Sequence, residues 1–220
     1  IDFIFDETVT QESINQYPVV FLANVAVLGR KEIEILRQYV KQGGTLISTY
    51  DTSLCDETGQ RLSNFQLNDV FGVDYVETYD CDTNYLRNLG DIFGKDIDSR
   101  YYILNQGRVH IVKPTAAKGF GDLHDSFFKR IVPERFFSHN IHPPYKRLTD
   151  VLYVNKYGKG TSIYLPHGVD ASYADNYELP EHRLLMRNIV KAFSNPPLLE
   201  IRANLNVEAV VAEKDDKILI

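Results

Sequence analysis

The sequence has no tryptophan, a single methionine and only two cysteines among its 220 residues. Cys55 and Cys81 are too few for a disulfide framework, and a chain of this length buries a core without one. We therefore expect both cysteines to be free thiols. The lack of tryptophan disfavours a dedicated carbohydrate-binding module, because the surfaces on which sugars stack are usually rich in that residue.

The sequence also lacks long apolar runs and clusters of basic residues. Its longest apolar stretch, around Val19 to Ala23, is far too short to span a bilayer. The formal net charge is −6 and the pI is near 5.5, which argues against a surface for nucleic acid or for anionic lipid. We expect neither nucleic acid nor membrane among the partners of this chain.

The composition is that of an ordinary globular domain, with 44% hydrophobic and 25% charged residues. Strand-like runs stand at both ends of the chain, at Ile1–Phe5 and Lys217–Ile220, and the first residue is not methionine. No signal-peptide pattern is present. We expect the chain to be a part of a longer protein, so the sequence does not indicate a cellular compartment.

The first part of the chain carries the pattern of a parallel βαβ unit. Tyr17–Ala23 is a short run of apolar and β-branched residues, which is typical of a buried strand. Arg30–Gln42 has apolar residues at helical spacing, and the two glycines that follow it end the helix. Thr45–Tyr50 has the composition of a second buried strand. This order with short connections predicts a right-handed crossover and a parallel sheet.

The middle of the chain is less regular. Leu62–Phe71 predicts a short helix and Val73–Thr78 predicts a strand. Tyr101–Leu104 and Arg108–Val112 flank an Asn-Gln-Gly turn, which predicts a β-hairpin. Ala116–Pro144 is rich in His, Phe, Gly and Pro, and we interpret it as a long surface excursion of the kind that often carries function.

Regular patterns return in the last third of the chain. Asp150–Lys156 and Thr161–Leu165 enclose a turn with glycine and predict a β-hairpin. Leu179–Phe193 predicts a helix with Pro180 in its first turn, where the missing N–H is harmless. The expected buried stripe of this helix is Leu184, Leu185, Ile189, Val190 and Phe193.

The best candidate for a domain boundary is Asn195-Pro196-Pro197, because consecutive prolines interrupt regular structure. Short strand-like runs follow it. We expect an α/β domain over residues 1–195 and the start of a C-terminal all-β domain over residues 196–220.

Several short motifs form a series along the chain. One strand ends in Leu-Ala-Asn, the next helix closes with Tyr-Val-Lys-Gln-Gly-Gly-Thr-Leu, and Ser-Thr-Tyr-Asp leads to a Cys-Asp-Glu-Thr-Gly turn. Leu67–Val73 then contains Phe-Gly-Val, and Gly158–Pro166 has the pattern of a closing strand. In patches, and above all over Tyr17–Val76, this series resembles the trimerisation domain of the family forty-two β-galactosidases and related glycoside hydrolases.

The resemblance implies a flavodoxin-like, class I glutamine-amidotransferase-like fold, which is a doubly wound α/β sheet, without amidotransferase activity. In that family the domain lies between a catalytic (β/α)8 barrel and a small C-terminal β domain. Ile1–Phe5 is then the second strand, with a first βα unit upstream. The implied function is a non-catalytic assembly domain of a multidomain, β-galactosidase-like glycoside hydrolase, which forms a homo-oligomer through the parent protein and uses no cofactor.

The residues themselves argue against catalysis by a cysteine. A nucleophilic Cys in an amidotransferase stands on a tight strand-to-helix turn flanked by glycines. Cys55 has no flanking glycine, and the two acidic residues after it disfavour a thiolate. Cys81 lies between two aspartates. A hydrolase that uses Cys55 with His167 is the alternative function, because His167 follows a strand as the catalytic His of amidotransferases does.

The loops after parallel strands form the ligand-facing edge of such a sheet. Tyr50, Asp51 and His167 lie on these loops, and a third hypothesis is a binding module that holds a small sugar there. His139 and His142 have a His-x-x-His spacing downstream of a His-Asp pair, but two prolines follow and the spacing alone is a weak signal for zinc. We expect no metal site.

Two pairs of phenylalanines, Phe127–Phe128 and Phe136–Phe137, lie in the excursion outside any clear element. Such pairs either cap a local core or contact a partner. They are the candidate interface residues of the expected oligomer.

Overall fold

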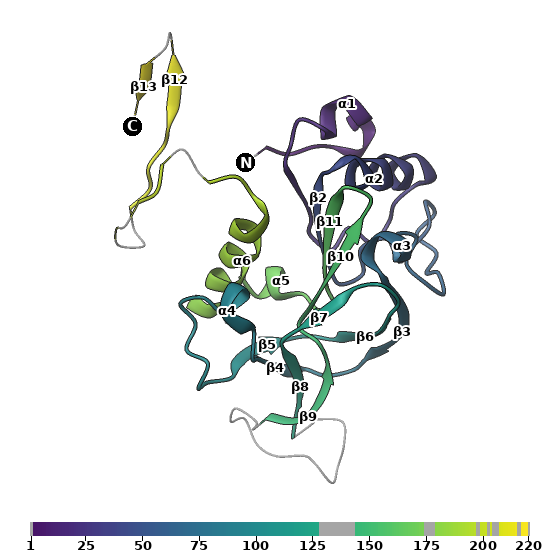
Figure 1. Ribbon diagram of the computed structural model, residues 1–220. Helices are drawn as coiled ribbons and strands as arrows, with labels where there is room; N and C mark the ends of the chain where they lie inside the picture. The colour runs from purple at the N-terminus through teal and green to yellow at the C-terminus, as the bar shows by residue number, and fades with distance from the viewer. Residues whose placement is uncertain are drawn as a thin grey trace.

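The computed structural model of the chain describes residues 2–127, 144–173, 179–196, 199–201, 203, 207–214 and 217–219. Its central element is a five-stranded sheet with the strand order β1-β2-β11-β10-β7 (Figure 1). Neighbours β1, β2 and β11 are parallel, whereas β10 and β7 pair antiparallel. The strands are β1 (Val19–Leu22), β2 (Thr45–Thr49), β7 (Lys118–Phe120), β10 (Leu152–Tyr157) and β11 (Gly160–Leu165).

The predicted βαβ unit is confirmed. Helix α2 (Arg30–Gln42), which has the predicted bounds, connects β1 to its parallel neighbour β2. Gly43 ends the helix with a φ of 130°, a conformation that side chains rarely tolerate. The buried Tyr39 hydroxyl lies 3.0 and 3.1 Å from the backbone oxygens of Tyr17 and Thr45, so it ties the end of α2 to the starts of both strands.

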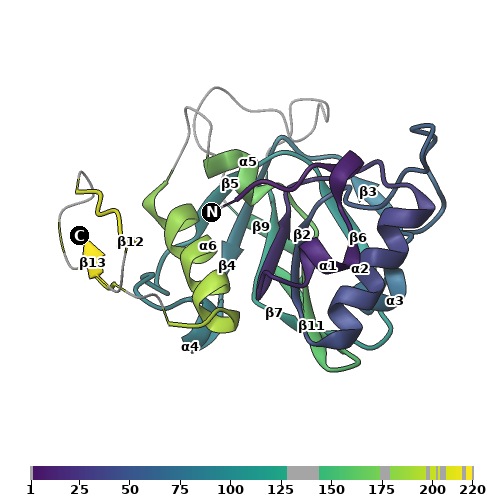
Figure 2. The same ribbon diagram turned by 90° about the horizontal axis from the view of Figure 1, so that it is seen from above.

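Helices cover both faces of the main sheet (Figure 2). On one face, α2 and α3 (Asn68–Phe71) share a core with Leu46 and Tyr164. On the other face, α6 (Pro180–Phe193) shares a core with Ile47 and Ile163. Leu46 and Ile47 are adjacent but belong to opposite cores, because side chains alternate along a strand. The predicted α/β class is therefore confirmed, with a parallel centre and antiparallel flanking strands.

The hairpin of β10 and β11 is also confirmed. Tyr157 pairs with Gly160 at its end, and Gly158 occupies the turn with a φ of 59°. The start of β11 lies against the end of α2, where the backbone N–H of Lys159 donates to the oxygen of Lys41 at 3.0 Å.

The last helix is present as α6, with proline at its first position, but its predicted buried stripe is wrong at Val190, which is 39% exposed. Asn188 is buried in place of Val190. The Asn188 amide donates to the backbone oxygens of Phe93 and Lys95, at 3.0 and 2.7 Å. A polar residue faces inward here because two backbone oxygens satisfy its amide, which a hydrophobicity pattern does not reveal.

Other strands form three smaller antiparallel sheets, with the orders β3-β6, β5-β4-β8-β9 and β12-β13. The predicted hairpin of Tyr101–Leu104 with Arg108–Val112 is wrong, because β5 pairs with β4 and β6 pairs with β3. A two-residue hairpin turn favours positive φ at its central residues, and in this turn only Gly107 has one, at 90°. These strands are β3 (Val73–Tyr79), β4 (Thr83–Arg87), β5 (Ile103–Gln106), β6 (Val109–Pro114), β8 (Asp122–Ser126), β9 (Pro144–Thr149), β12 (Ala212–Lys214) and β13 (Lys217–Leu219).

The predicted surface excursion over Ala116–Pro144 is wrong in its first part. Its first residues form β7, which extends the main sheet, and β8, which pairs with β4. Leu123 on β8 is fully buried, so this segment belongs to the core. Residues 128–143 lie outside the described part of the chain.

The predicted strand at Ile1–Phe5 is wrong over its described residues. Asp2–Phe5 pairs with no strand in the described part of the chain, and the side chains of Phe3 and Phe5 are 85% and 67% exposed. Without a neighbouring strand, an apolar run does not become a strand. The remaining helices are η1 (Asp6–Thr8), α1 (Gln11–Ile14), α4 (Gly90–Phe93) and α5 (Val169–Tyr173).

Beyond α6 the chain leads to the β12-β13 sheet, which lies away from the main sheet (Figure 1). Two strands alone are only marginally stable in water. The division into domains at residue 195 stays a prediction. None of the helices in the described segments is long and apolar enough to cross a membrane.

Candidate functional site

Three residues with left-handed backbone gather beyond the carboxyl ends of the parallel strands β1 and β2. The φ angles are 52° at Asn24, 46° at Tyr50 and 64° at Ser53. Positive φ is uncommon for residues other than glycine, and strained residues cluster at functional sites. The carboxyl ends of parallel strands are also where open α/β sheets bind ligands. We call this region the carboxyl edge and take it as the candidate site.

Tyr50 follows β2 directly and turns the chain out of the sheet. Its ring stacks on the imidazole of His110 on β6, with the ring centroids 4.2 Å apart and the planes at 12°. The hydroxyl of Tyr164 donates to the Tyr50 backbone oxygen at 2.8 Å. Burial raises the pKa of the Tyr50 phenol to about 12. A strained turn after a strand is where some hydrolases place their nucleophile, and here it carries a phenol that stays protonated at neutral pH.

Asp51 connects the carboxyl edge to the neighbouring β3-β6 sheet. Its Oδ1 lies 3.0 Å from the Nη1 of Arg61 and 3.0 Å from the Nε2 of His110. Burial alone raises the pKa of the Asp51 carboxyl, but the hydrogen bond and charge of His110, together with Arg61, outweigh it and hold this pKa below its usual value. The carboxylate is therefore ionised and shared between two partners.

His110 completes this network. Its side chain is fully buried, and its Nδ1 lies 3.1 Å from the Thr78 hydroxyl, which also accepts a hydrogen bond from Arg61 at 3.0 Å. Burial lowers the pKa of His110, although Asp51 opposes the shift. We call Tyr50, Asp51, Arg61, Thr78 and His110 the edge network. Every charged group in it has a partner inside the network, which joins the loop after β2 to strands β3 and β6.

Sequence reasoning missed His110, Arg61 and Thr78. The one available signal was a histidine that interrupts the apolar residues of the predicted strand Arg108–Val112. Its partner Asp51 lies 59 positions upstream. Because β6 joins a different sheet from β2, no local pattern brings these two residues together.

His167 does not join the edge network. Its imidazole is fully buried, its Nε2 lies 3.0 Å from the Val151 oxygen, and its Nδ1 has no hydrogen-bond partner among the described residues. Burial lowers the pKa of His167 to about 4, so the ring is neutral near pH 7. Tyr50 and Asp51 meet at the carboxyl edge, and a ligand role for these three residues stays a prediction.

The two cysteines are free thiols, as predicted. Cys55 is partly buried at a turn, and no hydrogen bond links its sulfur to His167 in the described part of the chain. Cys81 is buried, with its sulfur 3.3 Å from the Gly107 oxygen. The described residues thus contain no thiol and imidazole arranged as a catalytic pair.

Of the predicted interface residues, Phe127 lies in the described part of the chain. It is 39% exposed, and its ring packs edge-on against Tyr145 of β9 with the centroids 5.3 Å apart. The predicted interface residues Phe128, Phe136 and Phe137 lie outside the described residues, as do His139 and His142. Within the described residues, no group of three or more His, Cys, Asp or Glu side chains is placed to hold a metal ion.

Comparison with protein families gives one match. Residues 2–131, which are more than half of the chain, match the family described as β-galactosidase trimerisation domain. No curated protein matched the chain.

Solved structures of similar fold include several glycosidases. A β-galactosidase from Bacillus circulans sp. alkalophilus matches with a TM-score of 0.60 and 19% identity, over 84% of this chain and 24% of that chain. An α-L-fucosidase isoenzyme 2 from Paenibacillus thiaminolyticus matches with a TM-score of 0.63 and 18% identity, over 83% of this chain and 26% of that chain. A cold-adapted β-galactosidase from Rahnella sp. R3 matches with a TM-score of 0.59 and 17% identity, over 81% of this chain and 23% of that chain. At these identities the likeness shows the fold alone.

This chain spans about a quarter of the length of those enzymes. Its fold is mixed α/β, with a parallel centre of β1, β2 and β11 and further antiparallel sheets. Because the family match covers most of that fold, from residue 2 to residue 131, the chain belongs to the β-galactosidase trimerisation domain family.

Proposed function

We propose that this chain is the assembly domain of a larger, β-galactosidase-like glycoside hydrolase, and that it holds three copies of the parent protein together without performing chemistry. The observation that carries the proposal is the family match over residues 2–131. The structural matches cover only 23% to 26% of each similar enzyme, which supports the view that this chain is one domain of a longer protein. The parent would hydrolyse a glycoside at a site in another domain.

The carboxyl edge supports a non-catalytic role. A nucleophile on the turn after β2 would have to occupy the position of Tyr50, whose φ is 46°. The acidic and basic groups beside it, Asp51, Arg61 and His110, bind one another. The alternative of a hydrolase with Cys55 and His167 gains no support from these contacts.

The finer fold assignment is part of the proposal. A class I glutamine-amidotransferase-like, doubly wound fold is supported by the helices on both faces of the sheet and by the parallel order β1-β2-β11. The isolated β12-β13 sheet supports a separate C-terminal β domain after residue 195, because two strands need further partners to be stable.

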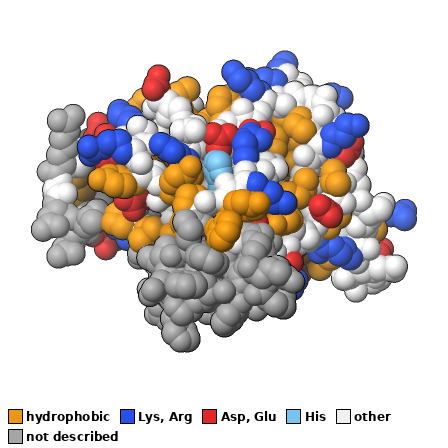
Figure 3. Space-filling model, turned by 90° about the horizontal axis from the view of Figure 1, so that it is seen from below, with side chains coloured by type: hydrophobic (Ala, Val, Ile, Leu, Met, Phe, Trp, Pro, Cys, Tyr) orange, Lys and Arg blue, Asp and Glu red, His pale blue; other side chains and the backbone are white. Residues whose placement is uncertain are grey.

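The β8-β9 side of the molecule is the proposed contact between copies. Phe127 and Tyr145 present paired rings that are 39% and 48% exposed. Figure 3 views the side on which β8 and β9 lie in Figure 1, and there hydrophobic side chains are interspersed with Lys and Arg side chains. Exposed aromatic rings within a polar surround are typical of protein–protein contacts.

The proposal is tested by the solution mass of the intact protein carrying Phe127→Asp, measured by sedimentation velocity. A charge at a buried contact disfavours association, so we expect the trimer to shift towards monomers. Val190→Asp is the matched control, since Val190 has the same exposure of 39% but lies on α6. If the Phe127→Asp variant is still a trimer, the contact does not involve Phe127. If only the Val190→Asp variant loses the trimer, the contact lies on α6.

A further inference from the structure

A cyclic trimer imposes a requirement on the surface of each copy. Two copies related by a two-fold axis meet through the same surface, whereas each contact in a closed ring of three joins two different surfaces. The exposed rings of Phe127 and Tyr145, which we call the aromatic pair, belong to one surface of the proposed contact. A second surface that receives the aromatic pair is therefore needed elsewhere on each copy.

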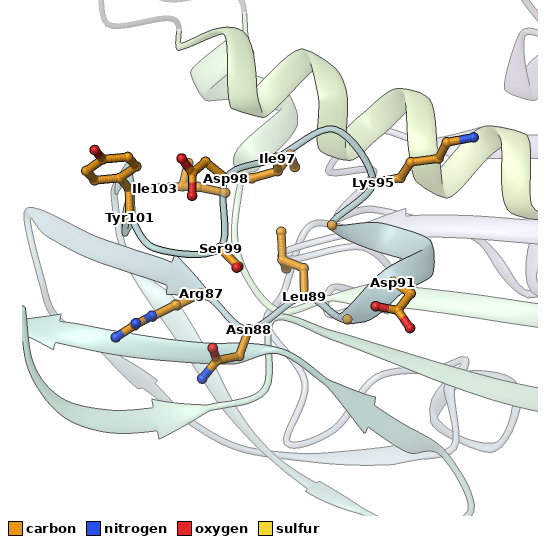
Figure 4. Close-up of a pocket in the computed structure, with 12 residues that line it drawn as sticks. Arg87, Asn88, Leu89, Asp91, Lys95, Ile97, Asp98, Ser99, Tyr101 and Ile103 are labelled. Carbon is orange, nitrogen blue, oxygen red and sulfur yellow. The ribbon is translucent and has the colours of Figure 1, made fainter.

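A pocket on this chain has the position that such a second surface requires (Figure 4). It lies between the end of β4 and the segment that leads to β5, and we call it the β4-β5 pocket. Arg87 at the end of β4 pairs with Asp122, the first residue of β8, whereas Phe127 follows the last residue of β8. An extended chain covers about 17 Å between Asp122 and Phe127. The pocket and the aromatic pair are too far apart to meet within one copy, so a contact between them joins two copies.

The size and floor of the pocket suit an aromatic side chain. Its volume is about 510 Å³, within the range of about 300–1,000 Å³ that is usual for binding pockets. Leu89 and Ile103 are 5% and 4% exposed and form part of its floor. In Figure 4, Leu89 and Ser99 point into the pocket from opposite segments. Aromatic anchor residues of protein–protein contacts fill pockets of this kind.

Exposed apolar side chains border the pocket. Tyr101, which lines it, is 66% exposed, and Ile92, which directly follows the lining residue Asp91, is 62% exposed. Among the described residues from β1 to α6, these two are the most exposed of the large apolar side chains. Burial of such side chains against a partner is favourable, and exposed apolar patches mark protein contacts. The border of the pocket therefore has the composition of a contact surface.

The charges on the two surfaces are compatible. Arg87 and Lys95 contribute two positive charges to the pocket, and Asp91 and Asp98 contribute two negative charges. No net field therefore repels Lys146, which lies on β9 beside the aromatic pair. Asp91 and Lys146 are exposed, opposite in charge and in no ion pair within the described part of the chain. Complementary charges of this kind orient a contact more than they strengthen it.

The wall of the pocket is fixed from outside. The amide of Asn88 donates to Asp122 on β8 at 2.6 Å. On α6, the buried amide of Asn188 donates to the backbone oxygens of Phe93 and Lys95, at 3.0 and 2.7 Å. A surface that is held in place before its partner arrives loses little entropy on binding.

We propose that the aromatic pair of one copy docks in the β4-β5 pocket of the next copy, so that three copies close a ring head to tail. This inference rests on the proposed function, because it requires a trimer of the parent, and it adds the second surface of the contact. Docking covers the floor at Leu89 and the exposed side chains of Tyr101 and Ile92. One contact repeated around a three-fold axis uses every aromatic pair and every pocket.

The test mixes two variants of the intact protein, each of which damages one surface. Phe127→Asp places a charge in the aromatic pair, and Ser99→Trp fills the pocket with an indole ring. A Phe127→Asp copy retains its pocket and a Ser99→Trp copy retains its aromatic pair, so one copy of each can form a single contact. Ser63→Trp is the matched control at another exposed serine. Far-UV circular dichroism checks that the variants fold, and Tyr101→Asp replaces Ser99→Trp if that variant does not.

Masses are measured by sedimentation velocity. We expect the unaltered protein and Ser63→Trp to be trimers, and each variant with a damaged surface to need at least tenfold higher concentration to assemble. The equimolar mixture is expected to contain a two-chain species that neither variant forms alone. The inferred contact is overturned if the pocket variant assembles as the unaltered protein does, or if the mixture contains no two-chain species. A single-chain mass of the unaltered protein would overturn the proposed function as well, so the two failures are distinguishable.

Discussion

The Nε2 of His110 lies 3.0 Å from the Oδ1 of Asp51, although 59 residues separate them in the sequence. Asp51 follows β2 of the main sheet, and His110 belongs to β6 of a smaller sheet. The contact therefore joins two separate sheets, beside a backbone hydrogen bond of 2.8 Å from the N–H of His110 to the oxygen of Pro166, which directly follows β11. Arg61 binds the same carboxylate oxygen, so one aspartate links the loop after β2, the following turn and β6.

The first prediction concerns this pair. In a double-mutant cycle with Asp51→Ala and His110→Phe, which preserves a ring beside Tyr50, we expect a coupling of about 0.5–3 kcal/mol in the free energy of unfolding. Each single change leaves a partly buried polar group without its partner. The measurement is urea denaturation at pH 7.

The exposed pair Asp98 and Arg100 is the matched control, with a shorter separation of 2.6 Å but side chains that are 41% and 78% exposed. Solvent screens such a pair, so its coupling is expected to be smaller. Equal coupling in the two cycles would show that the edge network does not brace the sheets.

The second prediction is a dependence of stability on pH through His167. Its pKa is about 4 in the folded protein, because it is fully buried, against an ordinary value of 6.5. Between these values the unfolded chain binds a proton that the folded chain does not. Stability is therefore lost as pH falls from 6.5 towards 4, and the full contribution of this group is about 3 kcal/mol.

The variant His167→Gln, which retains a donor for the Val151 oxygen, removes the titrating group. Its free energy of unfolding is expected to fall less steeply with decreasing pH, by up to about 1.4 kcal/mol per pH unit over that window. The nearby His182 is the charge that acts on His167, and it is unchanged in both proteins. The free energy of unfolding of both proteins is measured by denaturant titration at a series of pH values. If it changed with pH in parallel in the two proteins, the assignment to His167 would be wrong.

The third prediction tests the contact of α2 with the β10-β11 hairpin. A Cβ on Gly160 would overlap the backbone oxygens of Val40 and Gly44, and backbone cannot move aside as a side chain does. We expect Gly160→Ala to lower the free energy of unfolding by about 1–3 kcal/mol. Gly168→Ala is the control, because its Cβ would meet only Ala171, at an ordinary 3.7 Å. A thermal melt in which both variants behave alike would argue against this close approach.

The sequence was most informative where structure depends on neighbours along the chain. The bounds of α2, Arg30–Gln42, follow from its helical spacing and from the two glycines after it. The hairpin of β10 and β11 follows from two alternating runs and one glycine turn. In both cases the element and its partner are set by residues within a short stretch.

Pairing between distant segments was not predictable in this way. The run Ile103–Gln106 has the composition of a strand, yet its partner is β4 and not the run that follows it. Asp2–Phe5 belongs to an equally strand-like run, and it pairs with no strand in the described chain although β1 is an edge strand of the main sheet. Asn188 faces inward because its amide donates to two backbone oxygens.

The candidate site shows the same limit. Tyr50 and Asp51 were predictable, because they follow a parallel strand and such positions face the ligand edge of a sheet. His110 was not, since its position beside Asp51 depends on how the β3-β6 sheet docks on the main sheet. Arg61 was not either, since it reaches Asp51 through the fold of the turn in which Cys55 pairs with Arg61.

We propose that this domain assembles three copies of its parent. Sedimentation equilibrium of the intact, unaltered protein over a wide range of concentration tests this proposal. We expect a mass of three chains, which for this 25.2 kDa segment alone means three times that value. A single-chain mass at every concentration would contradict it.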